Sequence, residues 1–374
     1  MTRAEPPRTQ TEPPSKAQLA ARLTTLMDIA RAAMAGADPD LRDAIAAQSF
    51  LLPRTAHPSA LAQHGPAFAG QAPARSRLGT LARLLRGATR REPDWVGEDL
   101  PPRAGILVLS HYVGAGVTDD YFGSLAAVQV DGLPTVTARL NHTWRPLHRI
   151  AAASHGDVVF SRHTPLREGL RNLRALTRAA RALGPFVGDA FYADHIRAEA
   201  TASSNLFALR TATQVSRLVQ RLQPNVLLLT WEGHPWERLA IAAARRASPG
   251  ITCIAYHHGP LWPLATATAQ PLHPDYDPDA LAVTGDAAQA FFSARPLWQT
   301  RPVRIVGSPR AAGPVAEAPS RGKRLLVLPE GILDETVALF GLALAAKERH
   351  PDLEIDLRLH PVLDRRKVLA ALPA

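Results

Sequence analysis

Two glutamates and two tryptophans lie close together in the stretch TWEGHPWER, residues 230–238. Apolar residues precede this stretch and an alanine-rich segment follows it, so we expect a strand that leads through a short loop into a helix. Pro235 suits the first helical turn because its φ angle is fixed. Glu232 then lies on the loop, where its carboxylate can act as a general base. Glu237 lies in the first helical turn, where it either takes part in catalysis or stabilises the helix dipole.

Further groups with binding chemistry follow in the same region. Trp236 offers a flat apolar face that either stacks on a sugar or base or packs in the core. The next apolar run ends in AYHHG, which brings His257 and His258 to the same edge if the two strands are neighbours. With His234 and Glu232 these histidines could form a zinc site, but nothing in the sequence fixes their geometry, and we expect no resident metal or cofactor.

A second group of polar residues lies in LSHYVGAGVTDDYFGSL. Gly114 and Gly116 allow a tight turn and a close approach of the backbone to a ligand. Their spacing does not match a dinucleotide-binding fingerprint. His111, Asp119 and Asp120 are further candidates for the general base, while helix capping explains at least one of the two aspartates.

Candidate nucleotide-binding groups recur at successive strand ends in the C-terminal third of the chain. The Gly-Ser pair of VRIVGSPR can offer backbone N–H groups to a phosphate, and its arginine adds a permanent positive charge. The glutamate of LPEG can accept hydrogen bonds from a ribose or base, and the histidine of RLHP can donate to a phosphate oxygen. These candidates are Gly307, Ser308, Arg310, Glu330, His360 and Pro361.

Such groups need a framework that brings strand ends together. From about residue 103, short apolar runs alternate with helical segments, a pattern typical of a parallel sheet covered by helices. The Pro- and Asp-rich segment 273–279 resembles a linker. We therefore expect two α/β units that face each other across a cleft, where open sheets bind ligands. The expected helices cover 165–183, 205–222, 235–248, 286–294 and 332–350.

The remaining organisation follows from composition and periodicity. The segment 75–91 carries leucines on one helical face beside arginines, so it either packs on the following domain or lies on an anionic membrane. The expected parts are a disordered tail at 1–14, a helical N-terminal extension at 15–100, a first Rossmann-like domain at 101–272 and a second at 280–374.

Composition excludes several classes of protein. The 374 residues carry a formal net charge of +10 and one cysteine, which rules out a disulfide framework or a thiolate zinc site. The positive charge is mostly arginine, as a GC-rich genome also produces, so we expect no nucleic-acid partner. No run approaches the ~18 apolar residues of a membrane span. The sequence predicts a cytoplasmic protein with at most peripheral contact with the inner membrane.

Three pairs of stretches together resemble a known family: WEGHPWERLAIAAARR with ITCIAYHHG, VTGDAAQAFF with RPVRIVGSPR, and LLVLPEG with RLHP. They are similar to bacterial glycosyltransferases of the GT-B type that build surface carbohydrates such as O-antigen, over roughly 105–361. The resemblance implies two Rossmann-like domains, the first for the acceptor and the second for a nucleotide-activated sugar, with CMP favoured over UDP or GDP. The matching positions are Glu232, Pro235, Trp236, Glu237, Gly307, Ser308, Arg310, His360 and Pro361.

The resemblance also implies that either the sequence is a fragment or the second domain is abbreviated, because such a domain continues with another helix–strand unit after the position of Pro361. The expected function is metal-independent transfer of a sugar to a surface-glycan or lipid-linked acceptor. The alternatives are a non-hydrolysing nucleotide-sugar 2-epimerase and a catalytically inactive glycan-assembly protein at the membrane. The Asp-x-Asp spacing of DYDPD could hold Mn²⁺ or Mg²⁺, but its place before a strand argues against that site.

Overall fold

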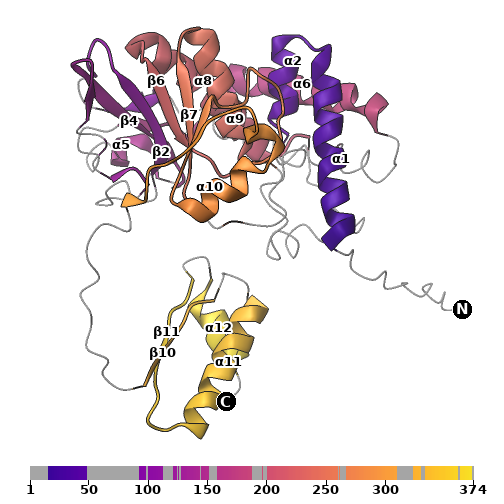
Figure 1. Cartoon of the computed structure of the whole chain (residues 1–374). Helices are drawn as coiled ribbons and strands as arrows, with labels where there is room; N and C mark the ends of the chain where they lie inside the picture. Colours follow the sequence, from indigo (N-terminus) through magenta and orange to yellow (C-terminus); the bar gives the residue numbers. More distant parts are fainter. Residues whose placement is uncertain are drawn as a thin grey trace, which may run out of the picture. The chain divides into compact units, whose positions relative to one another are not determined.

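The chain divides into two compact units with the main boundary at Ala311 (Figure 1). The predicted tail at 1–14 and the basic segment at 75–91 lie outside the described residues. The computed structural model describes residues 16–48, 92–97, 100–112, 121–123, 125, 128–143, 145–150, 158–187, 196, 200–259, 261, 267–309, 323–329, 333–360 and 363–372.

A nine-stranded, largely parallel sheet forms the framework of the first unit, with the strand order β1-β5-β4-β2-β6-β7-β8-β9 and β3 paired with β4. The pairs β1–β5 and β3–β4 are antiparallel, and the other pairs are parallel. The strands are β1 (Trp95–Val96), β2 (Ile106–Tyr112), β3 (Gln129–Val130), β4 (Leu133–Asn141), β5 (Val158–Phe160), β6 (Val226–Thr230), β7 (Thr252–His257), β8 (Ala280–Val283) and β9 (Val303–Ile305).

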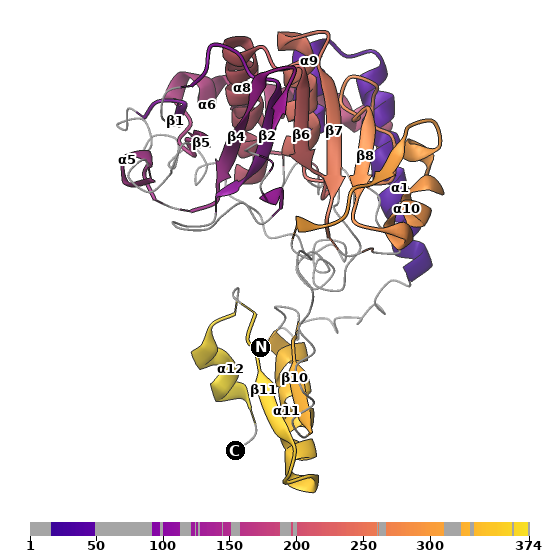
Figure 2. The ribbon, with the colours of Figure 1, turned by 60° about the vertical axis from the view of Figure 1, so that its left-hand side comes forward.

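The order of the strands creates a topological switch point between β2 and β6. From β2 the chain moves outward to β4 and β5, returns to β6 beside β2, and then continues in the opposite direction to β7, β8 and β9. Figure 2 shows β4, β2, β6, β7 and β8 side by side in this order. Leu109 pairs with Leu229, so the carboxyl ends of β2 and β6 lie at the same edge. Open α/β sheets bind ligands at such a point.

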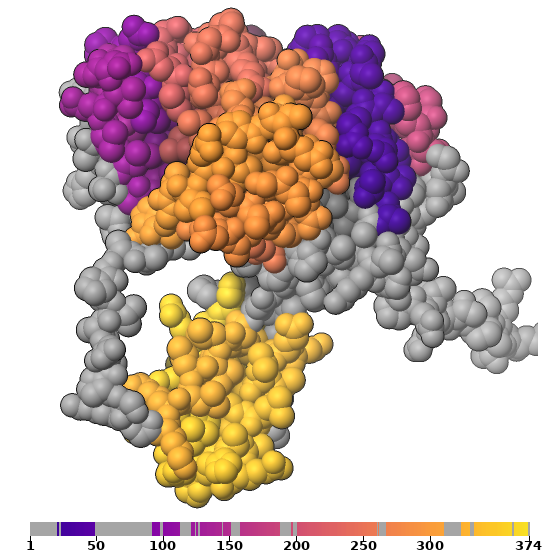
Figure 3. All heavy atoms as spheres, in the orientation of Figure 1, coloured from indigo at the N-terminus to yellow at the C-terminus, as the bar shows by residue number. Residues whose placement is uncertain are grey.

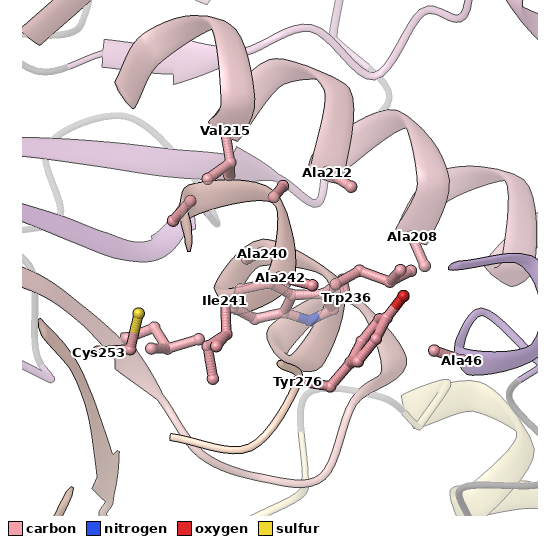
Figure 4. Packing of buried hydrophobic residues seen from close by; sticks show 14 of the residues in the cluster. Ala46, Ala208, Ala212, Val215, Trp236, Ala240, Ile241, Ala242, Cys253 and Tyr276 are labelled. Atoms are coloured by element: carbon pink, nitrogen blue, oxygen red, sulfur yellow. The ribbon is translucent and has the colours of Figure 1, made fainter. Parts of the chain in front are cut away.

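Helices of the first unit bury one face of the sheet in a large apolar core. Ala208 and Ala212 of α8 point toward α9, and these small side chains let the two helices approach closely (Figure 4). The helices are α1 (Lys16–Ala35), α2 (Pro39–Ala46), α5 (Leu147–Ile150), α6 (Leu166–Leu183), α8 (Ser203–Leu222), α9 (Pro235–Ala247) and α10 (Asp286–Ser293), with 3₁₀ turns η3 (Gly184–Phe186) and η4 (Pro296–Trp298).

Side chains of each strand alternate between the two faces of the sheet. On β2, Leu107 and Leu109 enter the large core, whereas Ile106 and Val108 join a smaller cluster that includes Tyr256. None of the helices in the described parts of the chain is long and apolar enough to cross a bilayer.

The two N-terminal helices belong to the first unit. Figure 3 shows the indigo surface of α1 against the orange surface of the same unit, and Arg31 donates to the carbonyl of Pro271 at 2.9 Å. Arg42 of α2 pairs with Asp275 at 3.0 Å, and Arg246 of α9 pairs with Asp43 at 2.7 Å. These contacts tie the predicted N-terminal extension to α9 and to the loop before β8.

The segment 273–279 is not a linker between domains. The buried Arg238 binds Asp277 and donates to the carbonyl of Ala267 at 2.6 Å, and Asp279 accepts the backbone N–H of Cys253 at 2.7 Å. β8 and β9 then extend the first sheet beyond β7. The first unit therefore continues to Ala311, whereas the sequence predicts that the second domain begins at 280.

The second unit is a small β-α-β-α arrangement. β10 (Arg324–Val327) and β11 (Glu354–Leu357) pair in parallel, α11 (Leu333–Arg349) packs against both strands, and α12 (Arg365–Ala371) packs against α11. Its buried residues include Phe340, Ala343 and Val368, while Leu326 and Leu342 are more than half exposed. The predicted α/β class is confirmed. The arrangement of two Rossmann-like domains across a cleft stays a prediction.

Candidate functional site

Polar side chains at or directly after the ends of β2, β4, β6 and β7 meet at the carboxyl edge of the first sheet. His111, on β2, lies with its Nε2 atom 3.2 Å from the hydroxyl of Thr230, the last residue of β6. This contact spans the switch point, where the helices that follow neighbouring strands diverge and leave room for a ligand. This edge of the sheet therefore has both a location that favours ligand binding and side chains that can exchange protons.

The buried side chain of Glu237 fixes the backbone conformation of the loop after β6. Its fully buried carboxylate accepts the backbone N–H groups of Glu232, Gly233 and His234 at distances of 2.8 to 3.1 Å. Gly233 has φ of +84°, and an added Cβ would lie 2.8 Å from the Cβ of Ala267, so the loop requires glycine there. Glu237 is buried and held by the backbone, so its role is structural and not the catalytic one considered from the sequence.

Glu232 is the carboxylate that this loop presents at the edge of the sheet. One carboxylate oxygen lies 3.2 Å from Nε2 of His234, and the other lies 3.1 Å from Nε2 of His258. The side chains of Glu232 and His234 are 21% and 26% exposed, whereas that of His258 is 8% exposed. A carboxylate oxygen can accept more than one hydrogen bond. Glu232 can thus accept a proton or hydrogen bond from a ligand while both imidazoles hold it.

His111 and His142 form a second, neutral pair beside this carboxylate. Their Nδ1 and Nε2 atoms lie 2.6 Å apart. Burial, together with the adjacent His142, lowers the pKa of His111 to about 3. Burial also lowers the pKa of His142 to about 4. Both imidazoles are therefore uncharged near neutral pH.

The neutral pair belongs to a directed chain of hydrogen bonds. The hydroxyl of Thr230 donates to the Glu237 carboxylate at 3.4 Å, because an ionised carboxylate only accepts. Thr230 is then the acceptor for the Nε2–H of His111, and His111 accepts from His142 through Nδ1. This assignment places the ring proton on Nε2 in both His111 and His142. The chain fixes the orientation of both imidazoles against the loop that carries Glu232.

Aromatic rings line the same edge. The ring of Tyr121 lies 4.2 Å from that of His258 and 5.5 Å from that of His111, measured between centroids. Trp236 contacts His111 and stacks on His234 with centroids 6.3 Å apart. Its side chain is almost fully buried, so Trp236 supports the histidines and does not offer the open stacking face considered from the sequence.

His257 and His258 point to opposite faces, as alternation along a strand requires. The ring of His257 packs on Phe292 of α10 with centroids 4.6 Å apart, inside the large core. Burial lowers its pKa to about 4. His257 is therefore a core residue and not a substrate contact, whereas His258 joins Glu232.

The predicted phosphate-binding glycine lies at the same edge of the first unit. The hydroxyl of Tyr256 donates to the carbonyl of Gly307 at 3.1 Å, and the ring of Tyr256 lies 5.9 Å from that of His258. Gly307 has φ of +80°, which favours glycine. Gly307 and Ser308 thus follow β9 in the unit that carries Glu232, and not a separate second domain.

Other predicted site residues are not brought to this edge by the described structure. His360 is in the second unit, whose placement relative to the first is not defined. The following predicted residues lie outside the described part of the chain: Gly114, Gly116, Asp119, Asp120, Arg310, Glu330 and Pro361.

Sequence reasoning missed three members of the cluster: Tyr121, His142 and Thr230. His142 follows β4, whose run TVTARL is interrupted by Thr and Arg and so lacks the apolar continuity of the other strands. The available signal was a histidine at the end of a stretch that begins with the β-branched residues Thr135, Val136 and Thr137. Among the residues with described positions, no group of three or more His, Cys, Asp or Glu side chains is arranged to hold a metal ion.

Comparison of the chain with family models, with curated proteins and with solved structures finds no match. The resemblance to glycosyltransferases therefore rests on the sequence motifs, and the geometry of the site has to support a function by itself.

Proposed function

We propose that the chain transfers a sugar from a nucleotide-activated donor to a hydroxyl group of a glycan or lipid-linked acceptor, with Glu232 as the general base. One observation carries this proposal: a partly exposed carboxylate is held between two imidazoles next to the switch point of a parallel sheet. Such a position is where open α/β sheets bind ligands. A carboxylate held in a fixed orientation suits the removal of a proton from an alcohol.

In the proposed reaction, the acceptor O–H loses its proton to Glu232 as its oxygen bonds to the anomeric carbon of the donor. The bond between that carbon and the phosphate oxygen breaks, and the electron pair leaves with the nucleotide. His234 and His258 keep the carboxylate aimed at the edge of the sheet. Backbone N–H groups near Gly307 and Ser308 are the proposed donors to the leaving phosphate.

The neutral histidine pair supports this assignment. A cationic imidazole next to Glu232 would make the carboxylate a weaker base. His111 and His142 stay uncharged because burial lowers the pKa of each, so they add polarity without positive charge. His142, whose Nδ1 takes no part in the chain of hydrogen bonds, is proposed as a hydrogen-bond acceptor for a hydroxyl of the sugar or of the acceptor, and His111 orients it.

Nucleotide binding is the first test. CMP, UDP, GDP and TDP are added separately to the purified chain, and the thermal unfolding temperature is measured for the unmodified protein and for Glu232→Gln. A ligand at ~100 times its dissociation constant stabilises a protein by ~2.7 kcal/mol. We expect at least one nucleotide, CMP first, to raise the unfolding temperature of both proteins.

The products then distinguish the enzyme classes. Release of the free nucleotide that depends on an added acceptor supports glycosyl transfer. Conversion of the intact nucleotide-sugar to its epimer without any acceptor would indicate the 2-epimerase instead. If no nucleotide binds, the proposal of a nucleotide-sugar site is wrong.

A further inference from the structure

A stripe of arginines runs along the outer face of α6. The spacings alternate between four and three residues, which keeps these side chains on one side of a helix. The buried residues of α6, such as Leu176 and Ala179, occupy the opposite side. From first to last the stripe extends ~21 Å at 1.5 Å per residue. We define the arginine stripe as Arg167, Arg171, Arg174, Arg178 and Arg181, all of which are exposed.

Little negative charge balances the stripe. The only acid on α6 is Glu168, which is buried and pairs with Arg210 of α8 at 2.7 Å. Arg178 pairs with Asp38 at 2.7 Å. Within the described parts of the chain, the other four arginines of the stripe form no ion pair. The face therefore presents a net positive charge that is available to a partner.

Apolar groups accompany the charge. A hollow of ≈ 350 Å³ lies along α6, and its described lining combines Leu170, Leu173 and Thr177 with three arginines of the stripe. Directly after the helix, Phe186 of η3 is 45% exposed. An arginine side chain can donate two parallel hydrogen bonds to the oxygens of one phosphate. Leucine and phenylalanine side chains prefer the boundary between lipid headgroups and acyl chains.

We propose that α6 docks on the surface of an anionic phospholipid membrane. The arginine stripe contacts headgroup phosphates, and Phe186 and Leu170 enter the interfacial layer. A nucleic acid offers the same phosphates but has no apolar layer that the leucines of the hollow and Phe186 could contact. The presence of both arginines and apolar side chains on this face therefore favours a lipid surface. This inference is independent of the proposed function, because no residue of the Glu232 site lies on α6.

The test is sedimentation of the purified chain with vesicles of phosphatidylcholine alone and with about one third phosphatidylglycerol. The triple variant Arg171→Gln, Arg174→Gln, Arg181→Gln removes charge from the stripe and spares the ion pair of Arg178. A matched variant, Arg103→Gln, Arg221→Gln, Arg304→Gln, removes the same charge from exposed positions on other elements. Circular dichroism and thermal unfolding check that both variants fold.

We expect binding to the anionic vesicles only, with a loss of at least about tenfold in affinity for the stripe variant and a smaller loss for the matched variant. Phe186→Ser should also weaken binding, although it leaves the charge unchanged. Equal losses in the two triple variants would mean that diffuse charge is responsible, and the proposal would be wrong. Stripe-dependent binding to DNA or RNA without binding to anionic vesicles would also overturn it.

Discussion

The buried carboxylate of Glu237 accepts the backbone N–H of Glu232 at 2.9 Å. One glutamate thus folds the loop that presents the other. Glu237 is inaccessible and Glu232 is partly exposed, although only four residues separate them. The two residues should therefore respond differently to the same substitution.

Replacing Glu237 with Gln should lower the free energy of unfolding by about 2–3 kcal/mol, since a hydrogen bond to a charged group is typically worth 1.5–3 kcal/mol. The side-chain amide of the glutamine would also place its own N–H donors against backbone N–H donors of the loop, which cannot accept them. The helix dipole alone, the role expected from the sequence, is worth up to ~1 kcal/mol. Urea unfolding measures the difference, and a loss below about 0.5 kcal/mol would show that the buried hydrogen bonds matter little.

Stability should fall in mild acid. His111, His142 and His257 have a pKa of about 3, about 4 and about 4 because of burial, whereas a histidine in an unfolded chain has a pKa of ~6.5. Between these values the unfolded chain binds more protons. The free energy of unfolding therefore has its full value, as far as these histidines are concerned, above about pH 6.5. It falls as the pH drops toward about 4, by up to ~1.4 kcal/mol per pH unit for each histidine.

His257→Phe offers a control for this pH dependence, because it keeps an aromatic contact with Phe292 and removes one titrating group. Urea unfolding at about pH 7 and about pH 5 should show a shallower decline for the variant. An unchanged decline would mean that His257 is not neutral in the folded protein.

The thiol of Cys253 should be inert in the native protein. It is fully buried in β7, and burial raises its pKa to about 12. The thiolate is the reactive form, so a thiol reagent should modify Cys253 only when the sheet opens. Rapid labelling of the native chain at neutral pH, timed by mass spectrometry, would contradict the burial of Cys253 in the large apolar core.

Arg238 and Asp277 form a buried ion pair that fastens the loop before β8. Arg238→Met should cost about 3–5 kcal/mol because Asp277 is left without its main partner. Adding Asp277→Leu should restore part of the loss. A double variant less stable than the single one by urea unfolding would show that the charge of Asp277 is held by other groups.

The sequence could predict the parts of the fold that local chemistry decides. Pro235 at the start of α9 and the inequality of Glu232 and Glu237 follow from helix-start preferences. The membership of β8 in the first sheet could not be predicted, because the Pro- and Asp-rich segment before it has the composition of a linker. Its aspartates bind Arg238 and the backbone of Cys253, contacts that only the folded chain creates.

The direction of individual side chains was the other feature that the sequence could not predict. Adjacent histidines at 257 and 258 share a motif, but alternation sends His257 into the core and His258 to Glu232. Which of the two faces carries the ligand depends on the crossover connections. Those connections involve residues far apart in the sequence.

The most direct test of the account is the turnover of Glu232→Gln, with whichever nucleotide-sugar is selected by the nucleotide-binding screen. The substitution nearly preserves the shape of the side chain and removes its basicity. Acceptor-dependent release of the nucleotide should fall by ~10²-fold or more, while the thermal unfolding temperature should hardly change. Turnover equal to that of the unmodified chain would contradict the assignment of Glu232 as the general base.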